Sequence, residues 1–175
     1  MLKPPRAGIH QGAVYAGVPL VWVTAPLWIM RPKAGTYDAM QPRRADEVAD
    51  AFVGADGREV VLAQAKARPV VVLSNHAELR RLRQARVVPL YSYNAEGGVA
   101  RLRLEIERGR VGAAFHLSGD TGLRIYDGAL RLDQMQPVDS EFLSRQVASM
   151  SDRALAALLD HAVRYLRTLD RRPVA

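Results

Sequence analysis

The sequence predicts a mainly β protein with one C-terminal α-helix, arranged as a small curled sheet or barrel. Two observations predict this class. Short runs of β-branched and apolar residues are separated by turn residues, which is typical of sheet proteins. Over 151–169 the apolar residues instead recur every three or four positions, as in an amphipathic helix. With 175 residues, of which 49% are hydrophobic, we expect a single domain over 1–175.

The composition restricts the chemistry that the chain can carry. Cysteine is absent, which excludes disulfides and zinc–thiolate sites. The four histidines are scattered, and no glycine-rich nucleotide-binding pattern occurs, so we expect neither a metal nor a cofactor. The formal net charge of +7, nearly all from arginine, favours a polyanionic or acidic partner. No signal-like start or long apolar run is present, so we expect a cytoplasmic protein without a membrane partner.

The first part of the chain is expected to alternate strands with irregular segments. Residues 1–11 carry prolines and cations and are predicted to be a loose tail. The apolar run over 12–23 predicts one long strand or two, bent near Gly17. The segments that follow are predicted as a loop with three prolines (25–42), a short amphipathic helix (43–53), a turn (55–57) and a strand (59–62).

The run Val70–Leu73 predicts a strand buried on both faces. Pro69 has no amide hydrogen and suits the first residue of a strand, so we expect Arg68 where a loop enters that strand. A guanidinium there would be a charged, five-donor group on a rigid support. From the residues alone, a solvated arginine before an ordinary strand remains the alternative.

The second part is predicted to hold more strands and the final helix. The basic segment 76–86 indicates one or two helical turns. Strands are predicted over 86–93, 99–107, 111–117 and 128–135, with a hairpin tip at 108–110. Pro89 indicates a bulge or an edge in the first of them. Leu102, Leu104 and Ile106 alternate with charged residues in the second, which is typical of a half-buried strand. Ser151 is the expected N-cap of the last helix.

Four pieces of sequence, in order along the chain, resemble the MazF/PemK family of toxin endoribonucleases. Gly12-Ala13-Val14-Tyr15 is similar to the opening strand of the family. Gln64, followed by Arg68-Pro69 and the apolar run to Asn75, is similar to its Glu-Gln-x-x-x-Arg-Pro segment. Val88-Pro89-Leu90-Tyr91-Ser92 stands where the family has Val-Pro-Leu-Thr-Thr, and 129–139 is similar to its Ala-Asp-Gln segment.

The resemblance implies a fold, a reaction and a set of partners. The fold would be an SH3-like, plasmid-maintenance-toxin barrel that forms homodimers, with 25–57 and 94–110 as insertions. The activity would be metal-independent cleavage of single-stranded RNA, by attack of a ribose 2′-hydroxyl on the adjacent phosphate, in a toxin restrained by a cognate antitoxin. Arg68 would stabilise the phosphorane, and Tyr91 or Ser92 would contact a phosphoryl oxygen. The residues implied in substrate binding are Gln64, Tyr93, Asn75 and His76.

Departures from the family pattern leave an alternative open. Ala63 stands where the family has glutamate, and Tyr91 stands where it has the threonine near the scissile phosphate. The alternative is a catalytically inactive member of the same barrel that binds nucleic acid or a protein. The gyrase-poisoning CcdB variant of this barrel is disfavoured, because 170–175 contains no aromatic residue. His116, alone on a predicted strand, favours a structural role over a catalytic one.

Overall fold

The computed structural model describes residues 8–22, 27–30, 32–33, 36–37, 41–43, 60–62, 64–94, 101–117 and 127–170. The chain divides into two compact units, one formed by Met1–Val18 with Ala67–Ala175 and the other by Pro19–Lys66. The expected insertion over 25–57 lies within the second unit. The helix predicted over 43–53 and the turn predicted over 55–57 lie outside the described residues, apart from Arg43, which ends a strand.

The unit Pro19–Lys66 contains short antiparallel strands. In one sheet, β2 (Leu27–Met30) lies between β5 (Gln41–Arg43) and β6 (Val60–Leu62), and β3 (Pro32–Lys33) pairs separately with β4 (Thr36–Tyr37). The predicted strand over 59–62 is confirmed, whereas the predicted loop over 25–42 is wrong. Pro32 opens β3 and Pro42 lies on the edge strand β5, and these are the places where a strand tolerates proline.

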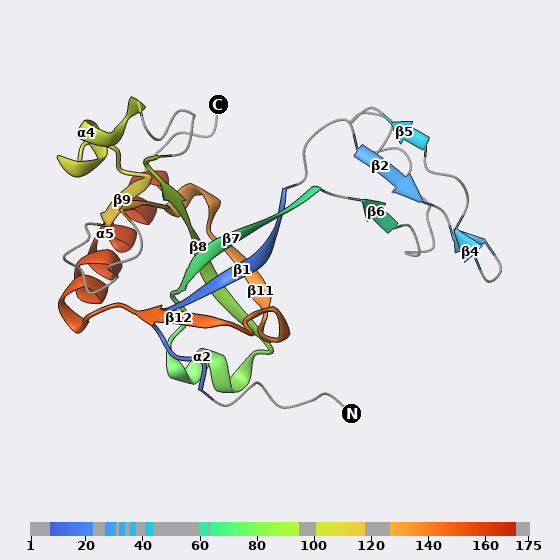
Figure 1. Ribbon diagram of the computed structural model, residues 1–175, viewed down its shortest axis with the longest axis horizontal. Helices are drawn as coiled ribbons and strands as arrows, with labels where there is room; N and C mark the ends of the chain where they lie inside the picture. Colours follow the sequence, from blue (N-terminus) through green and yellow to red (C-terminus); the bar gives the residue numbers. More distant parts are fainter. Residues whose placement is uncertain are drawn as a thin grey trace. The chain divides into compact units, whose positions relative to one another are not determined.

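The larger unit is built on a seven-stranded, mostly antiparallel sheet with the order β12-β1-β7-β8-β10-β9, and β11 also pairs with β8 (Figure 1). Its strands are β1 (Ala13–Trp22), β7 (Gln64–Val72), β8 (Gln84–Ser92), β9 (Ala114–Leu117), β10 (Gly128–Arg131), β11 (Gln136–Asp139) and β12 (Gln146–Ser149). The mainly β class with a C-terminal helix is confirmed. Among the described strands, β9 and β12 at the two ends of this order do not pair, so the sheet is open and not a closed barrel.

β8 is the central strand of this sheet, and it changes partner halfway along its length. β11 pairs with its residues 84–87, and β10 pairs with its residues 90–92. Pro89 lies in the gap between these two pairings. A residue without an amide hydrogen breaks no cross-strand bond on that side, which explains how proline is tolerated within a central strand. The edge or bulge predicted at Pro89 is therefore wrong.

Arg68 lies inside a strand and not at its entrance. β7 begins at Gln64, four residues earlier, so Pro69 is not the first residue of the strand as expected. The pairing of β7 with β8 covers Val70–Val72, C-terminal to the proline. The missing donor of Pro69 thus precedes that paired segment, and the backbone stays extended through it. These strand bounds place Arg68 on β7 itself, and the rigid support predicted for its guanidinium stays a prediction.

The segment predicted as a strand over 99–107 contains a helix, α4 (Arg103–Glu107). Arg103 Nε is bound to Glu107 Oε1 at 2.6 Å, an i,i+4 pair that stabilises a helix and not a strand. Gly109, expected at a hairpin tip, instead has φ +67° just beyond the helix. The amides of Gly109 and Arg110 donate to the carbonyls of Ile106 and Glu105, both at 2.9 Å, which is the Schellman ending.

The remaining helices agree better with expectation. The basic segment forms α2 (His76–Arg81), and the last helix is α5 (Asp152–Asp170). Ser151 Oγ accepts a hydrogen bond from the amide of Ala154 at 3.3 Å, which confirms the predicted cap. The short 3₁₀ turns η2 (Leu132–Gln134) and η3 (Ser140–Phe142) follow β10 and β11. β12 was not predicted, because its four residues include two polar ends and only two apolar positions.

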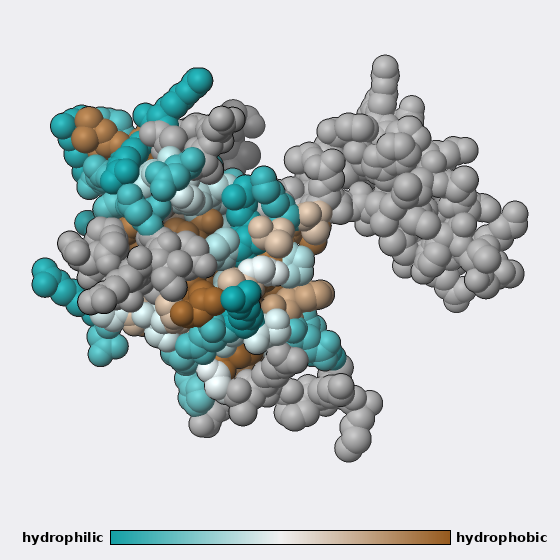
Figure 2. All heavy atoms as spheres, in the orientation of Figure 1, coloured by the Kyte–Doolittle hydropathy of each residue, from teal (hydrophilic) through white to brown (hydrophobic). Residues whose placement is uncertain are grey.

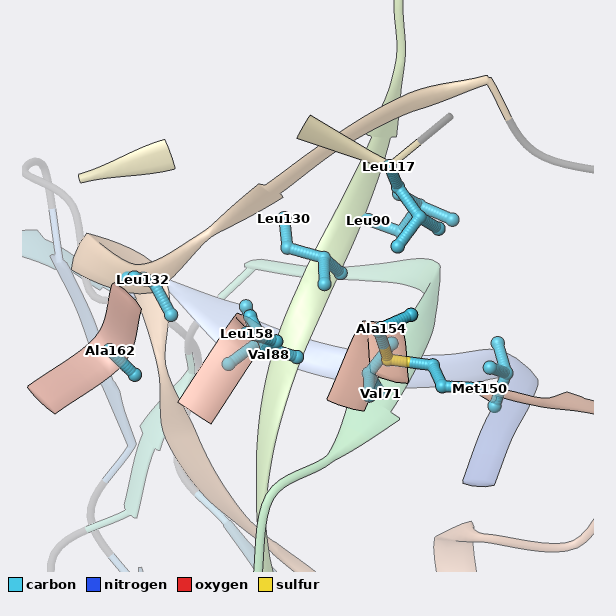
Figure 3. Packing of buried hydrophobic residues seen from close by; sticks show 11 residues of the cluster. Val71, Val88, Leu90, Leu117, Leu130, Leu132, Met150, Ala154, Leu158 and Ala162 are labelled. Carbon is cyan, nitrogen blue, oxygen red and sulfur yellow. The ribbon is translucent and has the colours of Figure 1, made fainter. Parts of the chain in front are cut away.

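The main core lies between α5 and one face of the sheet (Figure 3). Leu158 of α5 is fully buried against a cluster that includes Val71, Val88 and Leu130 from three neighbouring strands. Burying side chains of this size supplies roughly 1.5–3 kcal/mol each. α5 therefore holds this face of β7, β8 and β10 in place. The other face of these strands carries the residues described next.

Candidate functional site

Side chains from three strands and one turn meet around Tyr91, which lies near the end of β8. The guanidinium carbon of Arg68, from β7, is 4.2 Å from the centroid of the Tyr91 ring. The guanidinium carbon of Arg131, from β10, is 6.0 Å from the same centroid. The Tyr91 hydroxyl donates a hydrogen bond to Oε1 of Gln134, in η2. We call these four residues the Tyr91 cluster.

Strand register explains why these residues meet. Continuing the β7–β8 register two residues beyond Val70 places Arg68 opposite Tyr91. On the other side of β8, Ala129 is opposite Tyr91, and Arg131 follows it by two residues in β10. Residues that are opposite or two apart share a face of a sheet. The two arginines therefore flank Tyr91 from the strands on either side of it.

Arg68 has unused hydrogen-bonding capacity. It is half-buried, and its Nε is the buried side-chain donor that lacks a hydrogen-bond partner within the described part of the chain. None of the ion pairs found among the described residues involves it. A buried donor without a partner is costly, and a ligand oxygen that accepts from this edge of the guanidinium would remove that cost.

Arg131 differs from Arg68, because a carboxylate already holds it. Its Nε and Nη2 donate to the two carboxylate oxygens of Asp133 at 2.8 and 2.5 Å. This hydrogen bonding raises the pKa of Arg131 above its ordinary value, so the guanidinium stays charged. Among the described residues, the site thus contains one cation without an ion-pair partner, Arg68, and one cation paired with a carboxylate, Arg131.

Ser92 does not join the Tyr91 cluster. It is exposed and directly follows Tyr91 in an extended strand, so its side chain projects from the opposite face. Its Oγ accepts a hydrogen bond from the amide of Asn94 at 3.1 Å, where the strand ends in a turn. A catalytic contribution from Ser92 stays a prediction, and the geometry favours a turn-stabilising role.

Asn75 and His76 lie beyond the far end of β7 from Arg68. Asn75 is the N-cap of α2, and its Oδ1 accepts from the amide of Glu78 at 2.9 Å. His76 is the first residue of that helix and is exposed. The strand residues from Arg68 to Val72 alone span about 13 Å, at about 3.3 Å per residue. The structure therefore does not bring this pair together with the Tyr91 cluster.

Tyr93 is buried in a second, smaller hydrophobic cluster with Ile106, Ala114 and Ala129. Only 5% of the residue is exposed, so its ring is not available for stacking on a base. Its hydroxyl lies 3.0 Å from Nδ1 of His116, and the two rings stack with centroids 5.7 Å apart. The histidine thus packs on a buried tyrosine, which agrees with the structural role favoured for it.

Burial and nearby charge perturb the Tyr93 phenol. Burial raises the pKa of Tyr93 to about 12, and the carboxylates of Glu107 and Asp127 act in the same direction. Arg103, whose guanidinium carbon is 5.0 Å from the ring centroid, lowers this pKa in part. The phenol therefore stays neutral near pH 7 and can donate to or accept from the His116 ring.

Gln64 begins β7, and its side chain lies outside the described part of the structure. Its predicted contact with substrate remains untested. The sequence reasoning overlooked Arg131 and Gln134, although both lie in the segment 129–139 that carried the family resemblance. A signal was available: once β8 and β10 are paired through Ala129, the next residue on the same face of β10 is Arg131.

The Tyr91 cluster suits an anionic ligand with an aromatic or ribose part. Arginine edges bind phosphate through paired N–H groups, and stacking on a ring leaves those edges available. Within the described residues, no group of three or more His, Asp or Glu side chains could hold a metal ion. None of the described helices is long and apolar enough to cross a membrane.

Comparisons with known proteins give no sequence match but do give structural likenesses to solved proteins. No family model matches the chain, and no curated protein matches it. A solved structure described as an endoribonuclease from Mycobacterial species is 12% identical, over 58% of this chain and 81% of that chain, with a TM-score of 0.43. A structure of MazE-MazF from Deinococcus radiodurans is 15% identical, over 94% of this chain and 97% of that chain, with a TM-score of 0.42.

Proposed function

We propose that this chain is a metal-independent endoribonuclease of the MazF/PemK type, the toxin of a toxin–antitoxin pair, which binds single-stranded RNA at the Tyr91 cluster. The observation that carries the proposal is the guanidinium of Arg68 on the Tyr91 ring, whose Nε has no hydrogen-bond partner among the described residues. The ordered sequence pieces supply the family, and the net charge of +7 supports a polyanionic substrate. Cleavage would proceed by attack of a ribose 2′-oxygen on the adjacent phosphorus, which forms a 2′,3′-cyclic phosphate and breaks the bond to the 5′-oxygen. The proton lost from the 2′-hydroxyl is balanced by a proton gained by the leaving 5′-oxygen.

Arg68 would carry the electrostatic part of this reaction. Attack of the 2′-oxygen places additional negative charge on the non-bridging oxygens of the phosphorane. Arg68 is permanently charged, is uncompensated by any described carboxylate and lies on a rigid strand, so its donors are preorganised for that charge. Tyr91 already donates its proton to Gln134, so its oxygen is available to accept a hydrogen bond from the ribose.

The test is single-turnover cleavage of a long single-stranded RNA in EDTA. Arg68→Ala should lower the cleavage rate roughly 10²-fold or more, the scale for loss of one preorganised donor. The cleavage rate of Arg68→Lys should also be much lower than that of the wild type, because a lysine keeps the charge but not the paired donors. Arg153→Ala is the matched control, since Arg153 is an exposed arginine on α5, away from the Tyr91 cluster. Unchanged cleavage by Arg68→Ala would reject this site.

A second candidate function is RNA or protein binding without cleavage. One observation favours it: the residue in the position of the family threonine is Tyr91, and its hydroxyl proton is already engaged by Gln134. The same experiment separates the two functions. A wild-type protein that binds the RNA but never cleaves it would support the function without cleavage.

We also propose a homodimer and an acidic antitoxin partner. β9 and β12 end the strand order of the sheet, and unpaired strand edges favour association. Several large apolar side chains are exposed; in Figure 2 apolar surface is visible over α4, where Leu102 and Leu104 are 45% and 53% exposed. An acidic partner with apolar residues would complement both the charge and this surface.

A further inference from the structure

Asp133 holds one of the two arginines that flank Tyr91. Arg131 is bound by both carboxylate oxygens of Asp133, whereas Arg68 is not paired within the described part of the chain. Phosphate presents oxygens to arginine in the same forked geometry as a carboxylate. The carboxylate of Asp133 therefore occupies the position that a phosphate bound to Arg131 would take.

The two arginines approach Tyr91 from strands on opposite sides of β8. They come from β7 and β10, which lie on opposite sides of β8, so their backbones are about 10 Å apart at about 4.8 Å per strand. Tyr91 lies between them. This arrangement suits contacts with two different phosphates of one RNA strand better than two contacts with a single phosphate.

We propose that Arg131 is a second phosphate-binding residue, and that Asp133 occupies it until the RNA backbone displaces the carboxylate. This proposal rests on the proposed function, because it concerns the same RNA. It adds a binding subsite and a residue of the chain that competes with the substrate for it.

Replacing the Asp133 carboxylate by a phosphate should cost little free energy, since the Arg131–Asp133 pair is partly open to solvent. The Arg131 and Asp133 side chains are 29% and 31% exposed. Ion pairs in contact with water contribute little free energy, because both charges are well solvated when separated. A polyanion that replaces the carboxylate also releases counterions, which favours the exchange at low salt.

The opposite role for Asp133 makes the opposite prediction. If Asp133 only positions Arg131, its removal should leave the guanidinium disordered and weaken RNA binding. If it competes with RNA, its removal should strengthen binding, and the gain should require Arg131. The sign of the effect of one substitution thus separates the two roles.

The experiment measures affinity for a single-stranded RNA that is 2′-O-methylated at every position and therefore cannot be cleaved by 2′-hydroxyl attack. Fluorescence anisotropy is recorded over a series of salt concentrations. We expect Asp133→Asn to bind about two- to fivefold more tightly at low salt. Arg131→Gln should bind more weakly, and its plot of log affinity against log salt should be shallower by about 0.7, as for one lost phosphate contact.

Two further variants complete the test. In the double variant Arg131→Gln/Asp133→Asn, the gain from Asp133→Asn should disappear. Asp160→Asn is the matched control, because Asp160 pairs with Arg164 on the exposed side of α5 at 2.8 Å, so the substitution also frees an arginine and removes one negative charge. We expect Asp160→Asn to leave the affinity unchanged within about 1.5-fold, since both side chains are largely exposed and no described contact joins them to the Tyr91 cluster.

The outcomes are distinguishable. Tighter binding by Asp133→Asn but not by Asp160→Asn, lost in the double variant, supports the proposal. Weaker binding by Asp133→Asn, or equal gains in Asp133→Asn and Asp160→Asn, overturns it while leaving RNA as the ligand. An unchanged salt slope in Arg131→Gln also overturns it. Absence of RNA binding by the folded wild-type protein overturns the proposed function together with this subsite.

Discussion

Gly128 lies so close to Tyr91 that a Cβ atom on the glycine would stand 2.2 Å from the Tyr91 carbonyl oxygen. The two residues are on neighbouring strands, with Gly128 opposite Ser92 and Ala129 opposite Tyr91. The backbone of Gly128 does not have a positive φ, so lack of space and not conformation requires glycine there. The strand that carries Arg131 is thereby held directly against the strand that carries Tyr91.

Gly128→Ala should therefore destabilise the fold, because backbone must move to admit the methyl group. We expect a loss of about 3 kcal/mol in the free energy of unfolding, at the upper end for overpacking, measured by urea denaturation. Gly112→Ala is the matched control, since its Cβ would meet only Tyr165 Cδ2, at 3.9 Å. Equal stability of the two variants would contradict the close approach.

Tyr91→Phe tests the contribution of the Tyr91 hydroxyl separately from that of the ring. The phenylalanine ring can still stack on Arg68, but the hydrogen bond to Gln134 is lost. We expect a stability loss of about 1 kcal/mol. RNA affinity should stay within about threefold, and cleavage should fall about 10-fold or more if the hydroxyl orients the ribose. Single-turnover cleavage together with anisotropy measures both quantities, and an unchanged cleavage rate would remove Tyr91 from the reaction.

Stability should fall in alkaline solution through Tyr93. The pKa of Tyr93 is about 12 in the folded protein, against about 10 in an unfolded chain. The folded state therefore binds more protons between pH 10 and 12, so this residue makes the free energy of unfolding decrease as pH rises through that window. A shift of this size corresponds to at most about 3 kcal/mol at full deprotonation, of which part is reached by pH 11.

The measurement for Tyr93 is urea unfolding at pH 8, 10 and 11, on wild type and Tyr93→Phe. The variant loses the contact with His116 and should be less stable at pH 8. Its stability should nevertheless depend less on pH above 10, because phenylalanine has no proton to lose. Parallel pH profiles for the two proteins would contradict the raised pKa.

The proposed homodimer predicts a mass of about twice the 19.3 kDa of one chain in light scattering at micromolar concentration. The physical basis is the pair of end strands and the exposed apolar side chains, among which Phe142 and Leu104 are each 53% exposed. Leu104→Glu and Phe142→Glu are informative variants, because neither side chain supports the folded core. A monomer mass for the wild type over this concentration range would reject the dimer.

The sequence patterns predicted those elements in which local signals agree with the final packing. The apolar run at Val70 identified a central strand, and Ser151 with the apolar stripe identified α5. Failures occurred where a pattern has two readings. The alternation around Ile106 fits a strand, but the Arg103–Glu107 pair and the Gly109 ending stabilise a helix, and only Ile106 of the three alternating apolar residues is buried.

The candidate site was predictable only in part, for a reason of geometry. Arg68 and Tyr91 stand out locally, one before proline and one in the position of a family threonine. Their contact, and the roles of Arg131 and Gln134, depend on how β7, β8 and β10 are paired, which no single segment specifies. Asn75 was predicted to bind substrate because of its position in the motif. In the structure, its side chain instead caps the N-terminus of α2.

The pairing of β1 with β12 has a consequence for the order in which the protein matures on the ribosome. Ala13 is the partner of Ser149, so this ladder joins residues that are far apart in the sequence and are made at different times during translation. α5, which packs against the face of the sheet opposite Arg68 and Tyr91, is made later still. A nascent chain therefore has no complete support for the Tyr91 cluster until β12 and α5 have both left the exit tunnel.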